Sequence, residues 1–361
     1  MSIFRNNVQG FIPEEDWLSV GFDVQRQGDP LEAIMGDDRT DNIVAAWQSI
    51  AAEYQVPVMA QFHSLDTESQ KTFRVPVDNH SIEKGLIKVK LNQSESLRAA
   101  TRAGVQGDEA IYEYVMDDGL RLADQVFTRS KVAKAEMLAT GKVTIKENGI
   151  DTTVDYGVPT ANMNKALDFG AGSTATIPEQ LQELVDEAAA NGVALSGMVL
   201  SRASLTKLRQ DVNIQKDVNG NLGIGAMVRN RDFTDYMTEE YGIARIITDD
   251  LTYAVPDGYD ANGRPKVKTM RYFPADRISF FAPNASGRIG TGLWGDPPEV
   301  DVERFFEGGV NAAAERPFVY ISQWAERDPA VLWTKASALF MPVLYNPHAR
   351  YVASVKETVG A

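Results

Sequence analysis

The sequence predicts an α+β fold in which one very long helix separates two strand-rich regions. Three observations support this. Apolar residues in 107–145 keep a helical period over about nine turns, residues 56–92 alternate as strands do, and a helix–strand–helix pattern begins near residue 176. With 361 residues, of which 43% are hydrophobic and 24% charged, the chain has an ordinary globular composition and the length for two or more lobes.

Residues 1–40 predict an extended N-terminal arm. They are rich in Gly, Pro, Asp and Gln, and their large apolar side chains, Phe11 and Trp17 among them, are too scattered to form a core. We therefore expect the arm to lie on a surface that it does not itself supply.

Residues 41–55, "DNIVAAWQSIAAEYQ", predict a short amphipathic helix that begins at Asp41 and ends before Pro57. The next stretch reads as the strands "VPVMAQFHSL", "KTFRVPV" and "LIKVKL", separated by the polar "DTESQ" and the turn-like "DNHS". These strands carry too little apolar mass to fold alone, which predicts a long hairpin-like excursion that rests on another surface.

The long helix follows. Its apolar face is formed by residues at steps of four and seven: Ile111, Val115, Leu122, Val126, Ala133 and Met137. Asp108 offers an N-cap and Gly141 a stop, and the charges run from acidic to basic, as the helix dipole prefers. A coiled coil is the alternative, but Gly119 and charged residues interrupt the heptad, so a spine packed on strands is favoured.

A second, mixed lobe is predicted after the spine. "KVTIKENGIDTTVDYG" reads as a hairpin with Asn148-Gly149 in the turn, and "IPEQLQELVDEAAANG" as a helix with Pro178 in its first turn and Gly192 as its stop. Further strands are "GMVLS", "YGIARIITDDLTYAVP", "PKVKTMRYFP" and "DRISFFAP", and "RASLTKLRQD" is a short helix. The chain from 316 onward ends in strands.

Composition excludes several classes of protein. The chain has no cysteine, which removes disulfides, thiolate catalysis and zinc–thiolate sites, and it shows neither a signal peptide nor a membrane span. We expect it to be made in a cytoplasm. A net charge of −14 argues against a protein that grips nucleic acid.

Charge is unevenly placed near the N-terminus. Residues 11–41, which include Asp37 and Asp38, are strongly acidic, whereas residues 71–90 are basic. The basic side chains are Lys71, Arg74, Lys84, Lys88 and Lys90. The two segments are complementary in charge, although solvated faces that merely differ in sign would look the same.

Catalytic and ligand-binding motifs fail their context tests. The three histidines (His63, His80, His348) are far apart and predict no zinc site, and no nucleophile elbow occurs. "GTGLWG" at 290–295 matches the dinucleotide-binding pattern, but the "DPPEV" that follows cannot readily begin a helix. "DVNGNL" at 217–222 has Leu222 where a calcium loop needs Gly, and isolated aromatic–basic pairs such as Phe73–Arg74 predict packing. We expect no catalytic residue, cofactor or metal.

The order of arm, strand excursion, spine helix, hairpin, mixed lobe and strand-rich return resembles the Hong Kong 97-type fold of tailed-phage major capsid proteins. The stretch "DDGLRLADQVFTRSKVAKAEMLATGKVTIKENGIDTTVDYGVP" is similar to the lambda-like capsid protein E family, as are "RYFPADRISFFAP" and "WAERDPAVLWTKASALFMPVLYNPHARYVASV". The resemblance covers most of residues 40–356.

This resemblance implies a domain division. It gives an N-terminal arm and short helix in 1–55, an extended β-hairpin loop over a neighbouring subunit in 56–92, and a peripheral domain with the spine helix in 93–164. An axial domain follows in 165–315, and 316–361 returns to the peripheral domain.

The resemblance also implies function. The chain would assemble as pentamers and hexamers into an icosahedral phage head, first as a precursor shell with a scaffolding protein or domain and a portal, and then enclosing double-stranded DNA without sequence-specific binding. It would be a virion component made in the host bacterial cytoplasm, with no membrane. Some relatives carry a decoration protein, and no residue here identifies one. The arm and loop then predict inter-subunit contacts by Phe11, Trp17, Asp37, Asp38, Lys71, Arg74, Lys84, Lys88 and Lys90.

Two other functions remain open at this stage. One is a genome-free nanocompartment shell, and the other is a cytoplasmic homo-oligomeric enzyme with a site built from acidic residues across subunits. Shells predict megadalton particles, whereas the enzyme predicts a small closed oligomer.

Overall fold

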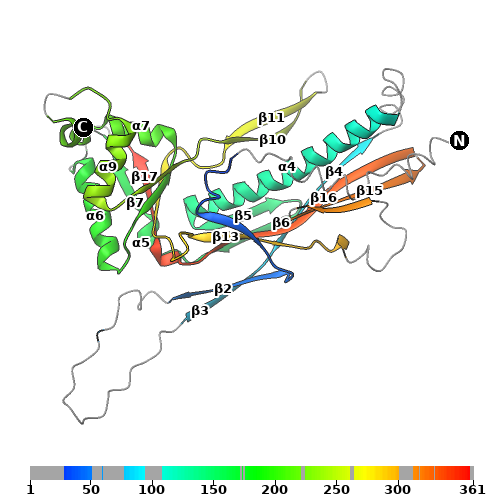
Figure 1. Cartoon of the computed structure of the whole chain (residues 1–361), viewed down its shortest axis with the longest axis horizontal. Helices are drawn as coiled ribbons and strands as arrows, with labels where there is room; N and C mark the ends of the chain where they lie inside the picture. Colours follow the sequence, from blue (N-terminus) through cyan, green and yellow to red (C-terminus); the bar gives the residue numbers. More distant parts are fainter. Residues whose placement is uncertain are drawn as a thin grey trace, which may run out of the picture.

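The structure is a computed structural model that describes residues 28–50, 59, 77–93, 108–170, 173, 175–220, 224–260, 264–300, 312–316, 318–328 and 330–357. These residues form an elongated body with a compact lobe at one end (Figure 1). Among the described helices, none is long and apolar enough to cross a membrane.

The elongated lobe consists of helix α4 (Asp108–Thr140, 33 residues) lying along a six-stranded sheet (Figure 1). The helix is about 50 Å long at ~1.5 Å per residue. It confirms the predicted spine, and it packs on strands as the spine interpretation requires. The sheet runs in the order β1 (Met35–Arg39), β13 (Gly290–Gly295), β16 (Ala330–Leu344), β15 (Val319–Arg327) and β14 (Ala312–Arg316), with β4 (Gly85–Gln93) also paired to β16.

Strand β16 organises this sheet. Its first half lies between β15 and β4, and its second half pairs with β13, so one 15-residue strand joins partners from three parts of the chain. Helix α4 buries Leu122, Val126, Ala133 and Met137 against it, four of the residues that the helical period predicts. Trp294 is fully buried in the same core, and its ring centroid lies 5.5 Å from that of Phe127 on the helix.

The compact lobe has its own core. Its five-stranded sheet runs in the order β7 (Lys165–Asp168), β17 (Arg350–Lys356), β12 (Arg277–Phe281), β8 (Gly197–Leu200) and β9 (Arg245–Thr248). The helices of this lobe are α5 (Thr160–Met163), α6 (Ile177–Ala190), α7 (Arg202–Gln210), α8 (Val212–Asn219) and α9 (Asn230–Tyr241). Helix α6 begins with a capping box, in which Thr176 and Glu179 bond each other's backbone N–H groups.

The strand pairing of the two lobes does not follow the predicted domain division. β13 falls in the range predicted for the axial domain but pairs in the six-stranded sheet, and β17 falls in the predicted peripheral return but pairs in the compact lobe. The short 3₁₀ helix η3 (Pro347–Ala349) connects β16 of one sheet to β17 of the other. Each lobe therefore contains a strand that the predicted division assigned to the other.

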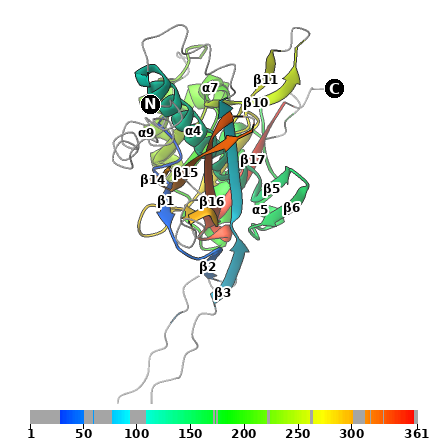
Figure 2. The same cartoon turned by 90° about the vertical axis from the view of Figure 1, so that its right-hand side faces the viewer.

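Three two-stranded sheets complete the structure. They are β2 (Val44–Ile50) with β3 (Val77–Glu83), β5 (Lys142–Glu147) with β6 (Ile150–Asp155), and β10 (Thr252–Tyr259) with β11 (Pro265–Arg271). The β5–β6 turn has Asn148 and Gly149 at φ of 50° and 83°, which confirms the predicted tight turn. Figures 1 and 2 show β2–β3 and β10–β11 extending from opposite sides of the body.

The helix predicted for residues 41–55 is wrong where the structure describes it, because 44–50 form β2. Val44, Trp47 and Ile50 have the spacing of a helical face, but Ala45, Trp47 and Ser49 are buried while Val44, Ala46 and Gln48 are exposed. Both a helical and a strand period fit so short a run, and the hydrogen-bond ladder to β3 makes it a strand.

Two further details of the predicted excursion are corrected. "DNHS" is not a turn but lies inside β3, opposite β2. "LIKVKL" is a strand as predicted, yet it belongs to the six-stranded sheet through β16 rather than to a projecting loop. The predicted strands in 56–76 lie outside the described residues, apart from Met59, which is exposed.

The glycines of "GTGLWG" are explained by close packing in β13. A Cβ at Gly290 would lie 2.2 Å from the Val343 carbonyl oxygen, and one at Gly292 would lie 2.4 Å from an Asp37 carboxylate oxygen. No real Cβ approaches so closely, so this strand needs glycine to accept its neighbours.

Candidate functional site

The described residues offer surfaces and charged clusters rather than reactive groups. The His80 ring stacks on Trp47 with centroids 5.2 Å apart, and its Nε2 lies 2.8 Å from Ser49 Oγ. No group of three or more metal-ligating side chains occurs in the part of the chain that the structure describes. The candidate functional residues are therefore the predicted contact residues.

Asp37 lies at the centre of a buried charged cluster where β1 meets β13. Its Oδ1 accepts hydrogen bonds from Lys134 Nζ at 2.7 Å and from Trp294 Nε1 at 2.8 Å. The Lys134 side chain is 2% exposed, so this ion pair is shielded from solvent. Helix α4 and both strands are thereby joined at one carboxylate, and Asp37 serves as an internal anchor for the N-terminal segment.

Asp38 and Arg39 make polar contacts outside this cluster. Asp38 accepts a hydrogen bond from Thr291 Oγ1 at 2.7 Å and lies 3.4 Å from Arg288, and Arg39 pairs with Asp296 at 2.6 Å. The side chains of Asp38 and Arg288 are 48% and 41% exposed, so Asp38 retains surface for another contact.

Lys84 occupies an internal position that its sequence neighbourhood did not indicate. It is only 3% exposed, and its Nζ donates to the Thr40 carbonyl and hydroxyl, each at 2.8 Å, and to the Trp294 carbonyl at 2.9 Å. Burial lowers the pKa of Lys84, while Asp296 and Asp41 oppose the shift. Lys84 thus joins the turn between β3 and β4 to β13, and it has little surface left for a neighbouring subunit.

Lys88 and Lys90 do lie on the exposed side of β4. Lys88 Nζ is 2.8 Å from Glu299, which also pairs with Lys335, and Lys90 Nζ lies 4.2 Å from the centroid of the Trp333 ring. Burial raises the pKa of Glu299, but the hydrogen bonds from Lys335 and Lys88 outweigh burial. The net pKa therefore lies below the ordinary value of a glutamate, and the carboxyl stays ionised. Both lysines remain open to solvent.

The nine predicted contact residues therefore do not form one site. Asp37 and Lys84 are internal, Asp38, Lys88 and Lys90 keep exposed surface, and Phe11, Trp17, Lys71 and Arg74 lie outside the described residues. For these last four the contact stays a prediction.

Sequence reasoning missed Arg350, which lies between the lobes. It is 1% exposed, and its Nη2 donates to the Leu138 carbonyl and to Ser279 Oγ. Leu138 is in the last turn of α4, which has no basic residue of its own, so Arg350 of β17 supplies the cation that the helix C-terminus favours. Burial lowers the pKa of Arg350 to about 9. The sequence shows a basic residue directly after "NPHA", but its hydrogen-bond partner, the Leu138 carbonyl, is 212 residues away along the chain.

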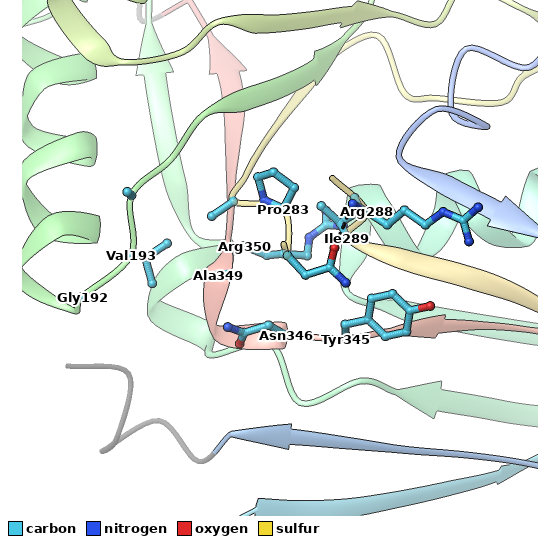
Figure 3. A pocket seen from close by; sticks show the side chains of 12 residues that line it. Gly192, Val193, Pro283, Arg288, Ile289, Tyr345, Asn346, Ala349 and Arg350 are labelled. Carbon is cyan, nitrogen blue, oxygen red and sulfur yellow. Dashed lines mark hydrogen bonds between the residues drawn. The ribbon is translucent and has the colours of Figure 1, made fainter. Parts of the chain in front are cut away.

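A hollow of about 290 Å³ lies beside this junction (Figure 3). Its lining includes Val193, Ile289, Tyr345 and Asn346, from both lobes and the link between them, and it contains two arginines but no acid. The Arg350 Nε and Nη1 atoms are themselves buried and have no hydrogen-bond partner in the structure, so the guanidinium is packed behind the hollow rather than open to it.

The β2–β3 pair is fixed to the body at its base. The Trp47 ring lies 5.9 Å from that of Tyr156, whose hydroxyl donates to the Pro342 carbonyl at 2.7 Å. Nearby, burial lowers the pKa of His348, with Asp78 opposing and His80 reinforcing the shift. The pair is thus held to the body through the tilted contact between the Trp47 and Tyr156 rings, whereas its outer face is exposed.

Comparison with known proteins gives one family. The model of the family described as phage major capsid protein E matches residues 68–355. No curated protein matches the sequence.

Two solved structures share the fold at low sequence identity. A protein assigned as the capsid protein of a prophage of Escherichia coli CFT073 has a TM-score of 0.52 at 12% identity, covering 98% of this chain and 97% of its own. A phage-related protein from Bordetella bronchiseptica RB50 has a TM-score of 0.51 at 10% identity, covering 93% and 96%.

Proposed function

The chain belongs to the phage major capsid protein E family, and from that premise we propose that it closes as pentamers and hexamers into an icosahedral head around double-stranded DNA. The family match over residues 68–355 carries the proposal. The family and the shared fold confirm the predicted Hong Kong 97-type capsid fold and a shell built from many subunits. Membership in a family of structural proteins makes the chain a shell component and not an enzyme.

The proposed division of the subunit is adjusted to its strand pairing. The peripheral domain comprises α4 with the six-stranded sheet, and so takes in β1, β4 and β13. The axial domain comprises α6 to α9 on the five-stranded sheet, and so takes in β17. The loop over the neighbouring subunit begins with β2 and returns with β3, and the arm is what precedes β1.

Scaffolding protein or domain, portal and packaged DNA complete the proposal as partners, with synthesis in the host bacterial cytoplasm. The net charge of −14 favours a wall that does not grip phosphates and so lets DNA move during packaging. It supports a container better than a nucleic-acid-binding protein.

Negative-stain electron microscopy of the purified chain, expressed alone and with a scaffolding partner, tests assembly. We expect hollow polyhedral shells, tubes, or rings of five and six subunits. A discrete dimer or tetramer that is unchanged by scaffold would contradict the proposal.

We also propose that the acidic arm contacts the basic segment 71–90 of a neighbouring subunit, of which Lys88 and Lys90 lie on β4. Reversing Lys84 would not test this contact, because it would place a carboxylate among the carbonyl oxygens of Thr40 and Trp294 and disturb folding. The informative variant is Lys88→Glu/Lys90→Glu, with Lys142→Glu/Lys146→Glu on the exposed β5–β6 sheet as a control of equal charge change. Fewer shells from the first variant alone would support the contact, and equal shell yields would remove Lys88 and Lys90 from it.

A further inference from the structure

The β10–β11 pair carries a row of apolar side chains along one face. Residues opposite each other in an antiparallel ladder share a face, and the register places Tyr253 opposite Met270 and Val255 opposite Lys268. The Tyr253 hydroxyl lies 3.8 Å from Met270 Sδ, and the Tyr253 ring centroid lies 5.0 Å from that of Tyr272, directly after β11. Tyr272 packs against the core of the elongated lobe, so the row continues from that core outward along the pair.

The outer part of this row is only partly covered by the described residues. Val255 and Met270 are 38% and 41% exposed, and Lys268 beside them is exposed as well. The pair extends away from the compact lobe, as Figure 1 shows, and an isolated pair of strands is at best marginally stable in water. An open apolar face of this kind is typical of a surface that another segment covers.

The described N-terminal segment begins at the root of the same pair. Arg245 of β9, the strand that leads into β10, donates from Nη2 to the Ala33 carbonyl at 3.0 Å. Burial, and with it the nearby Asp29 carboxylate, raises the pKa of Asp249, just before β10, and of Tyr272, just after β11. Asp29 therefore lies within electrostatic reach of both, and the residues that precede it leave the body where the apolar row starts.

The sequence before residue 28 has the pattern that such a face requires. In "LSVGFDVQ", residues 18–25, Leu18, Val20, Phe22 and Val24 alternate with polar or small residues, which is the period of a strand with one apolar face. At about 3.3 Å per residue, residues 18–28 span roughly 33 Å, enough to follow the eight residues of β10.

Charge favours the same contact. Residues 11–27 carry four acids and one arginine, a net charge of −3. Residues 252–271 carry four basic and two acidic side chains, a net charge of +2 in a chain whose net charge is −14. A basic hairpin on an acidic protein thus lies beside the origin of an acidic segment.

We infer that residues 18–27 pack along the face of β10–β11 formed by Tyr253, Val255 and Met270 of the same subunit. The short connection through Asp29 gives this segment a high effective concentration at its own hairpin, which favours it over the hairpin of another copy. The residues before Leu18 stay available for the neighbouring subunit proposed above. The contact lies within one subunit, so it does not depend on assembly into a shell.

Cross-linking of unassembled subunits tests the inference, because the chain has no cysteine of its own. The test variant is Val24→Cys/Val255→Cys. Val24 is five residues from Asp29, and Lys268, the ladder partner of Val255, is four residues from Tyr272, so both positions lie at a similar distance from the root. The control is Val24→Cys/Ile150→Cys, since Ile150 is 54% exposed on the β5–β6 pair.

The dilute protein is treated with a short bis-maleimide, which bridges more than the ~7 Å between Cα atoms that limits a direct disulfide. Linked peptides are then identified by mass spectrometry of the tryptic digest. We expect the link in the test variant, in a band of monomer mass, and little or none in the control. A link found only in dimers would overturn the inference in favour of a second copy, and no link or equal links in both variants would also overturn it.

Hydrogen exchange gives a second readout that needs no cross-link. Phe22→Asp places a charge in the alternating segment, whereas Phe11→Asp makes the same change outside it. Because the cover would be lost in the first variant alone, we expect the amides of β10 and β11 to exchange about tenfold faster there, with β5–β6 unchanged in both. Equal exchange of β10–β11 in the two variants would contradict the contact.

Discussion

The two hydrophobic cores of the subunit are built in different ways. The core of the compact lobe draws on one nearly continuous stretch, 165–281, plus β17, and packs four short helices on a small sheet. The core of the elongated lobe gathers α4, β1, β4, β13, β15 and β16, whose positions run from residue 35 to 344, and it encloses charged groups such as Lys84 and Lys134. The first core rests on local structure, whereas the second depends on long-range pairing and on buried charges that align it.

The largest expected difference concerns Trp294. Trp294→Ala removes a fully buried ring that contacts Phe127, Phe318 and Phe340, and it also removes the N–H donor to Asp37. We expect a loss of about 3–5 kcal/mol in the free energy of unfolding, measured by urea denaturation of unassembled subunits. Phe280→Ala, in the core of the compact lobe, is the matched variant. An equal or larger loss of stability from Phe280→Ala would contradict the expected difference between the two cores.

Lys134 gives the next effect. Lys134→Met leaves the Asp37 carboxylate without its ammonium partner in a nearly closed site, and we expect a loss of about 3 kcal/mol. Lys134→Met/Asp37→Leu removes both charges and should recover much of that loss in the same assay. A double variant as unstable as the single one would show that the loss comes from packing rather than from a buried carboxylate without its ammonium.

A smaller effect is expected in the compact lobe at Thr176. Thr176→Ala removes the N-cap acceptor of α6 and should cost about 1 kcal/mol, whereas Thr176→Ser keeps the hydroxyl and should cost less. Hydrogen exchange of the first turn of α6 would locate the change. If Thr176→Ala increased hydrogen exchange more in α4 than in α6, the two cores would not respond separately.

The smallest effect is a pH dependence from His348. Its pKa lies below 6.5 in the folded chain, chiefly through burial, so the unfolded chain takes up the proton first as the pH falls. The folded state therefore loses stability on acidification below about pH 6.5. Comparing urea midpoints at about pH 7 and about pH 5.5, we expect a smaller decrease for His348→Gln than for the unmodified chain. Equal decreases would assign the effect to other groups.

The compact lobe was largely predictable from the sequence because its signals are local. Pro178 at the start of α6, Gly192 after its end and the short apolar run of β8 each depend on a few neighbouring residues. The spine helix and the Asn148-Gly149 turn were predictable for the same reason.

The elongated lobe was less predictable because its decisive contacts join distant residues. Nothing near Lys84 indicates that it will be surrounded by oxygens of Thr40 and Trp294, and nothing near Asp37 indicates Lys134. Seven residues of β2 fit two periods, and only the pairing with β3 resolves them. The candidate contact set was formed from runs of like charge, which do not distinguish an internal ion pair from a surface one.

The parallel pairing of β1 with β13 also sets an order of events during synthesis. Met35 lies opposite Gly290, so the N-terminal segment has no sheet partner until about 250 further residues have been translated, roughly 13–50 s at typical bacterial rates. During that interval most of the compact lobe can fold on the ribosome, although β17, its last strand, follows β16. Both sheets are therefore complete only after β16 and β17 have been translated.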